Sequence, residues 1–252
     1  MNSLPLNPQT PPMRHGRPAV VTGVEHPEGA HAARTLAEHG FDVVAHSFTP
    51  EAAERIARDI TSGGGRATAV VADLTIDREV DRLFTTVEDI HGHVDTVVHA
   101  AWLPGPESTG TSLETIHPHD WHRFVHAHLG MVFTTVRRAM QSMNTSGRAG
   151  SIVTVVGLGR SATETGDSTL ARQVIDGAIE AFTVAAARDL GARRVQVTSI
   201  RLVDELPTPE HPDERRAPDF DTALVRLADP VHHGGWSGRV LTAHAALPAA
   251  VH

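Results

Sequence analysis

Residues 19–39 read AVVTGVEHPEGAHAARTLAEH, and this stretch decides the fold of the chain. It begins with the apolar run Ala19–Thr22, which has the length and β-branched content of a buried strand. The turn that follows contains Gly23 and Gly29, and a helix is predicted over Ala30–His39. A strand, a glycine-containing turn and a helix in this order predict the start of a βαβ unit.

The same alternation continues along the chain. Short runs rich in valine alternate with longer amphipathic stretches, which is the pattern of repeated βαβ units around a parallel sheet. We therefore expect an α/β fold with a Rossmann-like, doubly wound parallel sheet of about seven strands and helices on both faces. The expected strands are Ala19–Thr22, Asp42–Ala45, Ala67–Ala72, Val94–His99, Ser151–Val156, Val195–Ile200 and Arg239–Ala243.

The segments between these strands carry the signals of amphipathic helices. Thr49 is an expected N-cap with Pro50 at the first helical position, and the glycine run from Gly63 ends that helix. Three apolar stripes are expected to face the core. They are Val80, Leu83, Phe84, Val87 and Ile90; Trp121, Val125, Leu129, Val132, Val136, Met140 and Met143; and Ile175, Ile179, Phe182 and Ala186.

The composition is that of one globular domain. The chain has 252 residues, of which 40% are hydrophobic and 21% are charged. We expect residues 1–17 to form a flexible N-terminal arm and residues 18–252 to form a single domain. The polar, proline-rich segment Asp204–Pro218 is expected to be a surface loop.

Charge and cysteine content exclude several classes of function. All 22 Lys and Arg positions are arginine, and with 30 acidic residues the formal net charge is −8, which disfavours nucleic acid and anionic membranes as partners. The absence of cysteine excludes disulfides, thiolate catalysis and thiolate metal sites. No segment has the pattern of a signal peptide or a membrane span, so we expect a cytoplasmic protein.

The turn after the first strand is of the kind that approaches a dinucleotide. In such turns, glycines let backbone N–H groups reach a pyrophosphate at the helix N-terminus. Gly23 and Gly29 fit this role, but Pro27 stands where a middle glycine belongs. Proline lacks an N–H and carries a ring, so that one donor is lost and the close approach is obstructed. Alternatively, Pro27 simply starts the helix.

Together with this turn, a series of short motifs resembles the short-chain dehydrogenase/reductase family over nearly the whole chain. The resemblance rests on the order and spacing of Val70–Leu74, Gly92–Val98, Asp120-Trp121, Gly150–Val153, Ala178–Thr183 and Trp236–Leu241. It implies an NAD(P)-binding fold in which Gly23 and Gly29 lie at the pyrophosphate and Asp73 and Leu74 contact the adenine. It also implies a dimer or tetramer formed through the long helices.

Two further positions bear on the cofactor. Where the family has an Asn-Asn-Ala-Gly turn after the fourth strand, this chain reads His99-Ala100-Ala101-Trp102. The indole is expected either to fill the space of the nicotinamide ribose or to fold back over the sheet edge. After the second strand, Ala45–Phe48 offers neither an acid for a ribose 2′-hydroxyl nor an arginine for a 2′-phosphate. We therefore expect no cofactor and regard the dinucleotide positions as vestiges of an NAD(P) site.

The catalytic side chains of the family are missing. In the family, a tyrosine phenol transfers a proton at the substrate oxygen, assisted by a lysine four residues later, a serine and an asparagine. This chain contains no tyrosine and no lysine. Alignment on the segment after the catalytic lysine places Arg172 at the tyrosine and Asp176 at the lysine. His128 stands at the asparagine, and the stretch from Gly157 to Gly159 stands at the serine.

These replacements leave alternatives open. Arg172 is no substitute acid because a guanidinium stays protonated at working pH. It either pairs with Asp176, four residues later on the same helix, or binds an anion in the former substrate pocket. Asp176 has the chemistry of a base. His128 is either a general acid or base, or a filler hydrogen-bonded to the backbone of the fourth strand.

Histidine is abundant, with 18 residues in the chain. His122 and His126 share a helix face at a spacing of four residues, which can hold Zn²⁺ or Ni²⁺. No acidic residue of the metalloprotease kind lies between them, and surface histidines account for the cluster more simply. No metal site is therefore expected.

Three functions fit these features. The leading hypothesis is a non-catalytic subunit that pairs with an active short-chain reductase, because every catalytic position is lost while the packing positions are kept. The second is a divergent enzyme that uses His128, Arg172 and Asp176, for example a carbonyl reductase with substrate-supplied protons or a cofactor-free dehydratase or cyclase. The third is a nucleotide-responsive binding protein.

Overall fold

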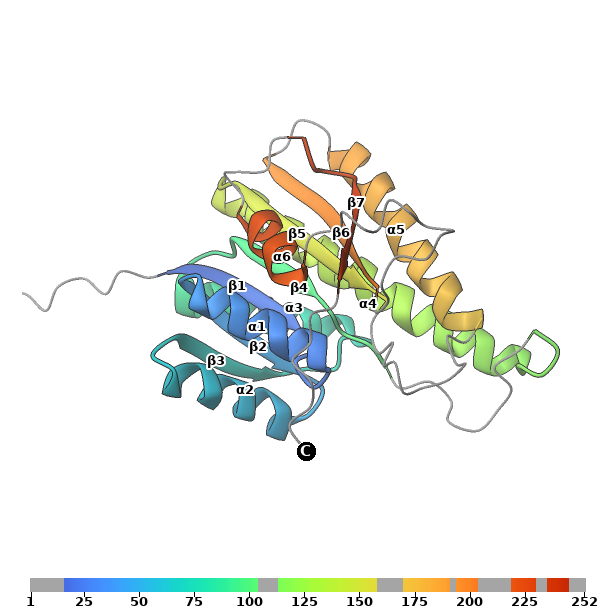
Figure 1. Cartoon of the computed structure of the whole chain (residues 1–252), viewed down its shortest axis with the longest axis horizontal. Coiled ribbons are helices and arrows are strands. Elements are labelled where there is room, and N and C mark those ends of the chain that lie inside the picture. The colour runs from blue at the N-terminus through green and yellow to red at the C-terminus, as the bar shows by residue number, and fades with distance from the viewer. Residues whose placement is uncertain are drawn as a thin grey trace, which may run out of the picture.

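The computed structural model describes residues 16–103, 113–157, 170–190, 194–203, 219–229 and 235–244 (Figure 1). Most of the expected arm, Gly159 and the expected loop Asp204–Pro218 lie outside these residues. All statements below concern the described ranges.

Seven parallel strands form one sheet in the order β3-β2-β1-β4-β5-β6-β7. Every residue of β2, β4 and β5 is buried, because helices cover both faces of a parallel sheet, and the inner strands are accordingly rich in valine. The seven expected strands and the doubly wound fold class are confirmed. The strands are β1 (Arg17–Thr22), β2 (Phe41–Ser47), β3 (Arg66–Val71), β4 (Thr96–His99), β5 (Gly150–Val156), β6 (Val195–Val203) and β7 (Val240–His244).

Helices cover the two faces of this sheet in two layers (Figure 1). In one layer α1 packs against α2 and α6, and in the other α4 packs against α3 and α5. The described helices are α1 (Pro27–Glu38), α2 (Pro50–Ser62), α3 (Asp77–His91), α4 (Pro118–Ser146), α5 (Leu170–Leu190) and α6 (Phe220–Ala228). None of them combines the length and the apolar character that a membrane crossing requires.

β1 begins at Arg17, which is the last residue of the expected arm. The backbone N–H of Gly16 donates to Asp42 at 2.9 Å, and the guanidinium of Arg17 forms a 2.9 Å ion pair with Asp229. These polar contacts hold the start of the strand. Polar contacts of this kind are not visible in the pattern of apolar residues, so the start of the domain predicted from the sequence lies later than the observed start of β1.

The expected stripe on α3 belongs to the core except at its end. Val80, Leu83, Phe84 and Val87 are buried, but Ile90 is 45% exposed. The expectation for Ile90 was therefore wrong. Ile90 lies only about 20° round the helix axis from the buried Leu83, so its exposure follows from its place in the last turn of α3 and not from its direction.

The expected stripe on α4 belongs to the core only in its second half. The 29 residues of α4 span about 43 Å, whereas the seven residues of β5 span about 23 Å. The first turns of α4 therefore extend beyond the strands (Figure 1). There Trp121, Val125 and Leu129 are only half-buried, at the margin of the core. Periodicity identifies an apolar face, but it does not say what covers that face.

Candidate functional site

The carboxyl ends of β1, β2 and β4 meet where the strand order reverses. Thr22 is paired with His46 on one side and with His99 on the other, and all three are buried. Nδ1 of His99 lies 3.2 Å from the hydroxyl of Thr22, and Nε2 of His46 donates to the carbonyl oxygen of Ala72 at 2.9 Å. In doubly wound folds this switch point is where ligands bind.

Both histidines at this switch point are held in the neutral form. Burial lowers the pKa of His99 to about 3, with smaller contributions in the same direction from His46 and His128. Burial also lowers the pKa of His46, and the hydrogen bond to Ala72 opposes this effect. The sequence patterns gave neither histidine a role, although a histidine inside an otherwise apolar strand is a usable signal.

Gly23 and Gly29 let the first turn pack closely. Gly23 has φ 78°, and a Cβ there would lie 2.4 Å from the carbonyl oxygen of Ala100. A Cβ on Gly29 would lie 2.2 Å from the carbonyl oxygen of Gly23. Both glycines are therefore required by the packing of the turn against the segment after β4 and against α1, whether or not a ligand binds.

Proline and two glutamates lie at the N-terminus of α1. Pro27 starts the helix, as one of the two interpretations predicted, and it offers no N–H. Glu28 in the same turn is 5% exposed. Both carboxylate oxygens of the neighbouring Glu25 are buried and accept no hydrogen bond. A helix N-terminus favours negative charge, and in this chain the side chains of Glu25 and Glu28 place that charge there.

Trp102 lies inside the site. Its carbonyl oxygen accepts a 2.7 Å hydrogen bond from Nε2 of His26, which ties the first turn to the segment after β4. The buried indole packs against Phe124 and His128 of α4, with ring centroids 5.7 and 4.2 Å away. The guanidinium carbon of Arg172, in the first turn of α5, lies 4.8 Å from the indole centroid. We refer to Trp102, Phe124, His128 and Arg172 as the indole cluster.

Both ring nitrogens of His128 are engaged. Nε2 accepts a 3.1 Å hydrogen bond from the backbone N–H of Leu103, so that Nδ1 carries the proton and donates to the carbonyl oxygen of Phe124 at 2.8 Å. Burial lowers the pKa of His128 to about 4; the two backbone hydrogen bonds oppose this, and the charge of Arg172 adds to it. Of the two roles expected for His128, these contacts favour the hydrogen-bonded filler.

The other positions around the expected proton relay are constrained in different ways. Asp176 lies one turn after Arg172 on α5 and is half-buried. Gly157 has φ 78°, and a Cβ there would lie 2.5 Å from the carbonyl oxygen of Leu202 in β6. A side chain at position 157 is therefore excluded by backbone, whereas Gly159 lies outside the described residues.

A resident metal site is not formed by the described part of one chain. Within those ranges, no group of three or more His, Asp or Glu side chains is arranged to hold a metal ion. The histidines expected to share a face, His122 and His126, both lie exposed on the first turns of α4.

Comparison with known proteins identifies the family. Residues 25–205 match the family model described as Enoyl-(Acyl carrier protein) reductase. The 3-oxoacyl-[acyl-carrier-protein] reductase of Synechocystis sp. is 29% identical over 185 residues, which cover 72% of this chain and 71% of that protein. This chain belongs to the short-chain dehydrogenase/reductase family.

The chicken protein "Dehydrogenase/reductase SDR family member 11" is 30% identical over 130 residues, or 51% of this chain, and the match spans about half (49%) of that relative. A hydroxysteroid dehydrogenase from Escherichia coli has a similar structure, with a TM-score of 0.71 and 23% identity over 90% of this chain and 95% of that chain. A short-chain type dehydrogenase/reductase from Mycobacterium marinum gives a TM-score of 0.74 at 20% identity, covering 91% and 94% of the two chains. These structures establish the fold.

Two positions of the short-chain family pattern are brought together here. His128, expected at the asparagine position, and Arg172, expected at the tyrosine position, both contact Trp102. The two residues expected at the adenine, Asp73 and Leu74, make local contacts. The carboxylate of Asp73 accepts hydrogen bonds from the N–H and hydroxyl of Thr75 at 2.9 and 2.6 Å, and its own N–H donates to Glu79 at 2.7 Å. Leu74 is fully buried in the core.

Proposed function

We propose that this chain is a non-catalytic subunit of the short-chain dehydrogenase/reductase fold that assembles with a catalytically competent homologue and stabilises or positions it. The observation that carries the proposal is Arg172. Where the family places its proton-transferring phenol, a guanidinium is stacked on Trp102, and the chain has no tyrosine or lysine to take over. A guanidinium keeps its proton at working pH and cannot perform the relay.

The remaining groups of the pocket support the same proposal. An acid or base must exchange its proton with a substrate. His128 uses one ring nitrogen as a donor and the other as an acceptor toward backbone, and with a pKa of about 4 it is neutral at pH 7 and has no acidic imidazolium proton to give. This leaves Asp176 as the only carboxylate among the aligned positions. A divergent enzyme would have to work through that group.

We further propose that the subunit works without a dinucleotide. A pyrophosphate at the N-terminus of α1 would meet the carboxylates of Glu25 and Glu28 and the ring of Pro27. Like charges in a poorly solvated turn repel strongly, because the screening by water is reduced. Trp102 also contacts this turn, because its carbonyl oxygen accepts a 2.7 Å hydrogen bond from His26, while its indole packs on His128 of α4. These residues do not fit an NAD(P) molecule.

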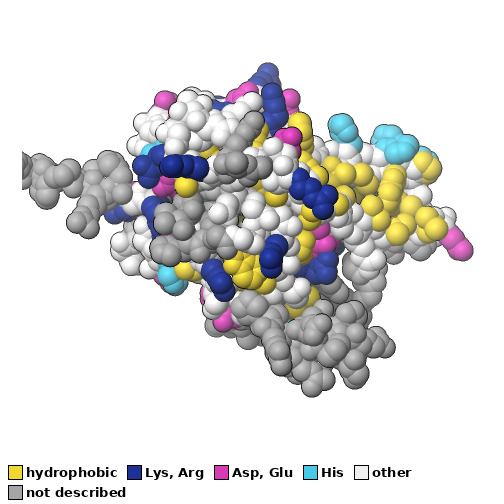
Figure 2. Space-filling model, turned by 90° about the horizontal axis from the view of Figure 1, so that it is seen from above, with side chains coloured by type: hydrophobic (Ala, Val, Ile, Leu, Met, Phe, Trp, Pro, Cys, Tyr) yellow, Lys and Arg dark blue, Asp and Glu magenta, His cyan; other side chains and the backbone are white. Residues whose placement is uncertain are grey.

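The surface of α4 and α5 is the proposed docking face. Phe133 on α4 is 53% exposed and Val174 on α5 is 41% exposed. Gly130 and Gly177 have open space where a Cβ would stand, so a partner helix can approach both helices closely. Figure 2 shows a yellow hydrophobic surface with cyan histidines beside it at the right end, where Figure 1 places the start of α4. An apolar patch of this kind is typical of an interaction site.

Copurification tests the proposal directly. The chain would be expressed with an active short-chain reductase from the same genome, and the complex would be isolated and assayed. We expect a stable complex in which the reductase gains stability, while this chain alone oxidises no NADH or NADPH. Phe133→Asp should abolish the complex, and Thr85→Asp, at an exposed position on α3, serves as the matched control. A lone homo-oligomer that turns over a carbonyl substrate would contradict the proposal.

A further inference from the structure

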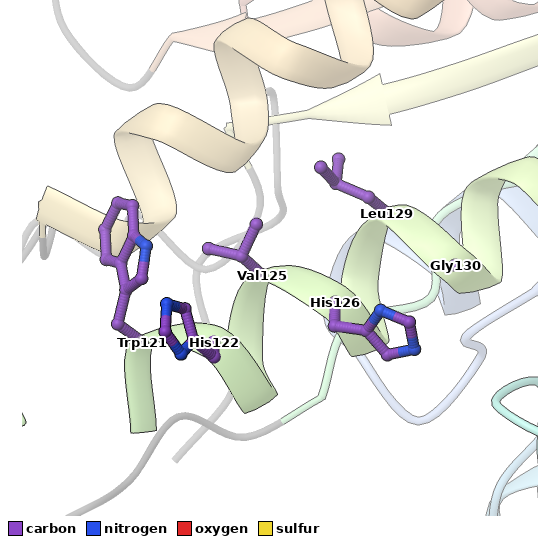
Figure 3. A pocket seen from close by; sticks show the side chains of 6 residues that line it. All are labelled: Trp121, His122, Val125, His126, Leu129 and Gly130. Atoms are coloured by element: carbon purple, nitrogen blue, oxygen red, sulfur yellow. The ribbon is translucent and has the colours of Figure 1, made fainter. Parts of the chain in front are cut away.

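Two cavities lie along α4, one near each end of the helix. The first, shown in Figure 3, is lined by residues of the first turns, from Trp121 to Gly130. It shares Gly130 with the docking face proposed above and belongs to that face. The second has a volume of about 480 Å³ and is lined by Glu88 and Gly92 of the end of α3 and by residues between Arg138 and Ser146 of α4. We refer to this second one as the α3–α4 cavity.

The α3–α4 cavity lies on the opposite side of α4 from the docking face. At 100° per residue, Ser142 lies about 180° round the helix axis from Phe133, and Arg138 lies about 140° from it. A partner seated on Phe133 therefore does not cover the cavity. Any ligand of this cavity is independent of the assembly proposed above.

The charged groups at the cavity leave an excess of negative charge. The two terminal nitrogens of Arg138 donate to the carboxylate of Glu88 at 3.0 and 2.9 Å, and Nε of Arg138 lies 3.4 Å from Asp81. Chiefly through the hydrogen bonds from Arg138, the pKa of Glu88 is lowered, so its carboxylate is charged at neutral pH. One guanidinium thus serves two acids, and its charge balances only one of them.

Two helix ends add to this negative potential. Gly92 and Gly147 cap α3 and α4 in the left-handed conformation, with φ of 78° and 66°. The last carbonyl groups of a helix have no partner within it, so the C-terminal turn carries a partial negative charge. The last turns of both helices line the cavity. The cavity therefore favours a cation over an anion.

The hydroxyl groups of α4 offer acceptors to a ligand. The hydroxyl of Thr145 donates to the carbonyl oxygen of Gln141 at 2.9 Å, and that of Ser146 donates to Met143 at 2.8 Å. Their hydrogens are used, while lone pairs remain. Ser142 is buried, and its Oγ has no hydrogen-bond partner among the described residues. A buried polar group without a partner is destabilising, so a ligand that hydrogen-bonds to it gains affinity.

We propose that the α3–α4 cavity binds an aliphatic amine with more than one ammonium group. An ammonium group donates hydrogen bonds and accepts none, which matches a negatively charged lining with free hydroxyl lone pairs. A volume of about 480 Å³ lies in the range of small-molecule sites, which favours a cation with a carbon chain over an inorganic ion. Within the described ranges, no three His, Asp or Glu side chains are arranged to hold a metal ion instead. The net charge of −8 attracts such cations to the chain.

Isothermal titration calorimetry of the full-length chain with spermidine tests the proposal. We expect saturable binding of one spermidine per chain. Thr145→Arg places a guanidinium at the exposed rim of the cavity and should weaken binding by about tenfold or more, because like charges then lie close together. Asn144→Arg is the matched control, since it adds the same charge at the neighbouring exposed residue, which does not line the cavity. It should change the Kd by less than about twofold.

Ser142→Ala tests the site from within. It removes the hydroxyl that has no partner, so it should leave the thermal unfolding of the free chain unchanged and weaken spermidine binding about fivefold, as expected for one hydrogen bond. Equal weakening by Thr145→Arg and Asn144→Arg, or no saturable binding at all, would overturn the assignment of the cavity. Competition by MgCl₂ as strong as that by putrescine would overturn the preference for an amine. None of these results bears on the copurification with a reductase.

Discussion

The guanidinium carbon of Arg172 lies 4.8 Å from the centre of the Trp102 indole ring. This contact joins the first turn of α5 to the segment after β4, across the place where the family pattern puts its tyrosine. On α4, His128 lies 4.2 Å from the same indole and Phe124 lies 5.7 Å from it. The side chains of the former pocket thus contact one another, and the indole cluster has the packing of a structural core.

The first prediction concerns the contribution of the indole cluster to stability. Trp102→Ala should lower the free energy of unfolding by about 3–5 kcal/mol, because it removes a large buried side chain and leaves a cavity. Urea denaturation followed by circular dichroism measures this change. Trp121→Ala is the control, since Trp121 is only half-buried and should have a smaller effect. A loss below about 1 kcal/mol for Trp102→Ala would mean that the cluster does not pack as described.

The second prediction concerns the missing relay. Arg172→Tyr/Asp176→Lys restores the two residue types to the aligned positions, yet it should produce no NADPH-dependent reduction of ketones or 3-oxoacyl thioesters. The reason is the proposed block of the cofactor site by Trp102, Glu25 and Glu28, since a phenol without an open pocket has no substrate to protonate. The absorbance of NADPH measures the turnover. Activity in this double variant would show that the pocket and cofactor site are intact.

The third prediction concerns acid. His99 and His128 have folded pKa values of about 3 and about 4, below the ordinary value of 6.5. The unfolded chain therefore binds more protons than the folded chain between pH 6.5 and these values, so folding loses stability as the pH falls through this range. Above pH 6.5 neither group has an effect. Each group should contribute a slope of up to about 1.4 kcal/mol per pH unit.

Urea denaturation at a series of pH values from 7 to 4 measures that slope. His99→Asn should reduce the slope by about one group's share, or 1.4 kcal/mol per pH unit. His39→Asn, at an exposed position after α1, should leave it unchanged. A stability that stays constant down to pH 4 would contradict the neutral, buried state of these histidines.

The strands were predictable from the sequence because burial on both faces forces continuous apolar runs. Val20 and Val44 in adjacent strands are both fully buried. How much of each helix is covered by the core was less predictable. Trp121 and Ile90 follow the apolar period of their helices, but the sheet does not extend under the first turns of α4, and Ile90 lies in the last turn of α3. Periodicity carries no information on where the covering element ends.

The sequence predicted which catalytic residue types are missing from the candidate site, but it did not predict the contacts of the residues found there. The absence of tyrosine and lysine is a matter of composition, and the two residues expected at the tyrosine and asparagine positions, Arg172 and His128, both contact Trp102. The hydrogen bonds that engage both ring nitrogens of His128 depend on the backbone of Leu103, which no pattern reveals. The burial of Glu28 likewise depends on tertiary packing, because an acidic residue in a first helical turn is ordinarily exposed.

The most direct test of the account is thermal unfolding of the chain with NADH and with NADPH, measured beside an active short-chain reductase. A dinucleotide present at about 100 times its Kd would stabilise the folded chain by about 2.7 kcal/mol. We predict that the reductase is stabilised and that this chain's unfolding temperature does not change with either dinucleotide up to millimolar concentration. A saturable rise in the unfolding temperature of this chain would contradict the claim that its own side chains have taken over the cofactor site.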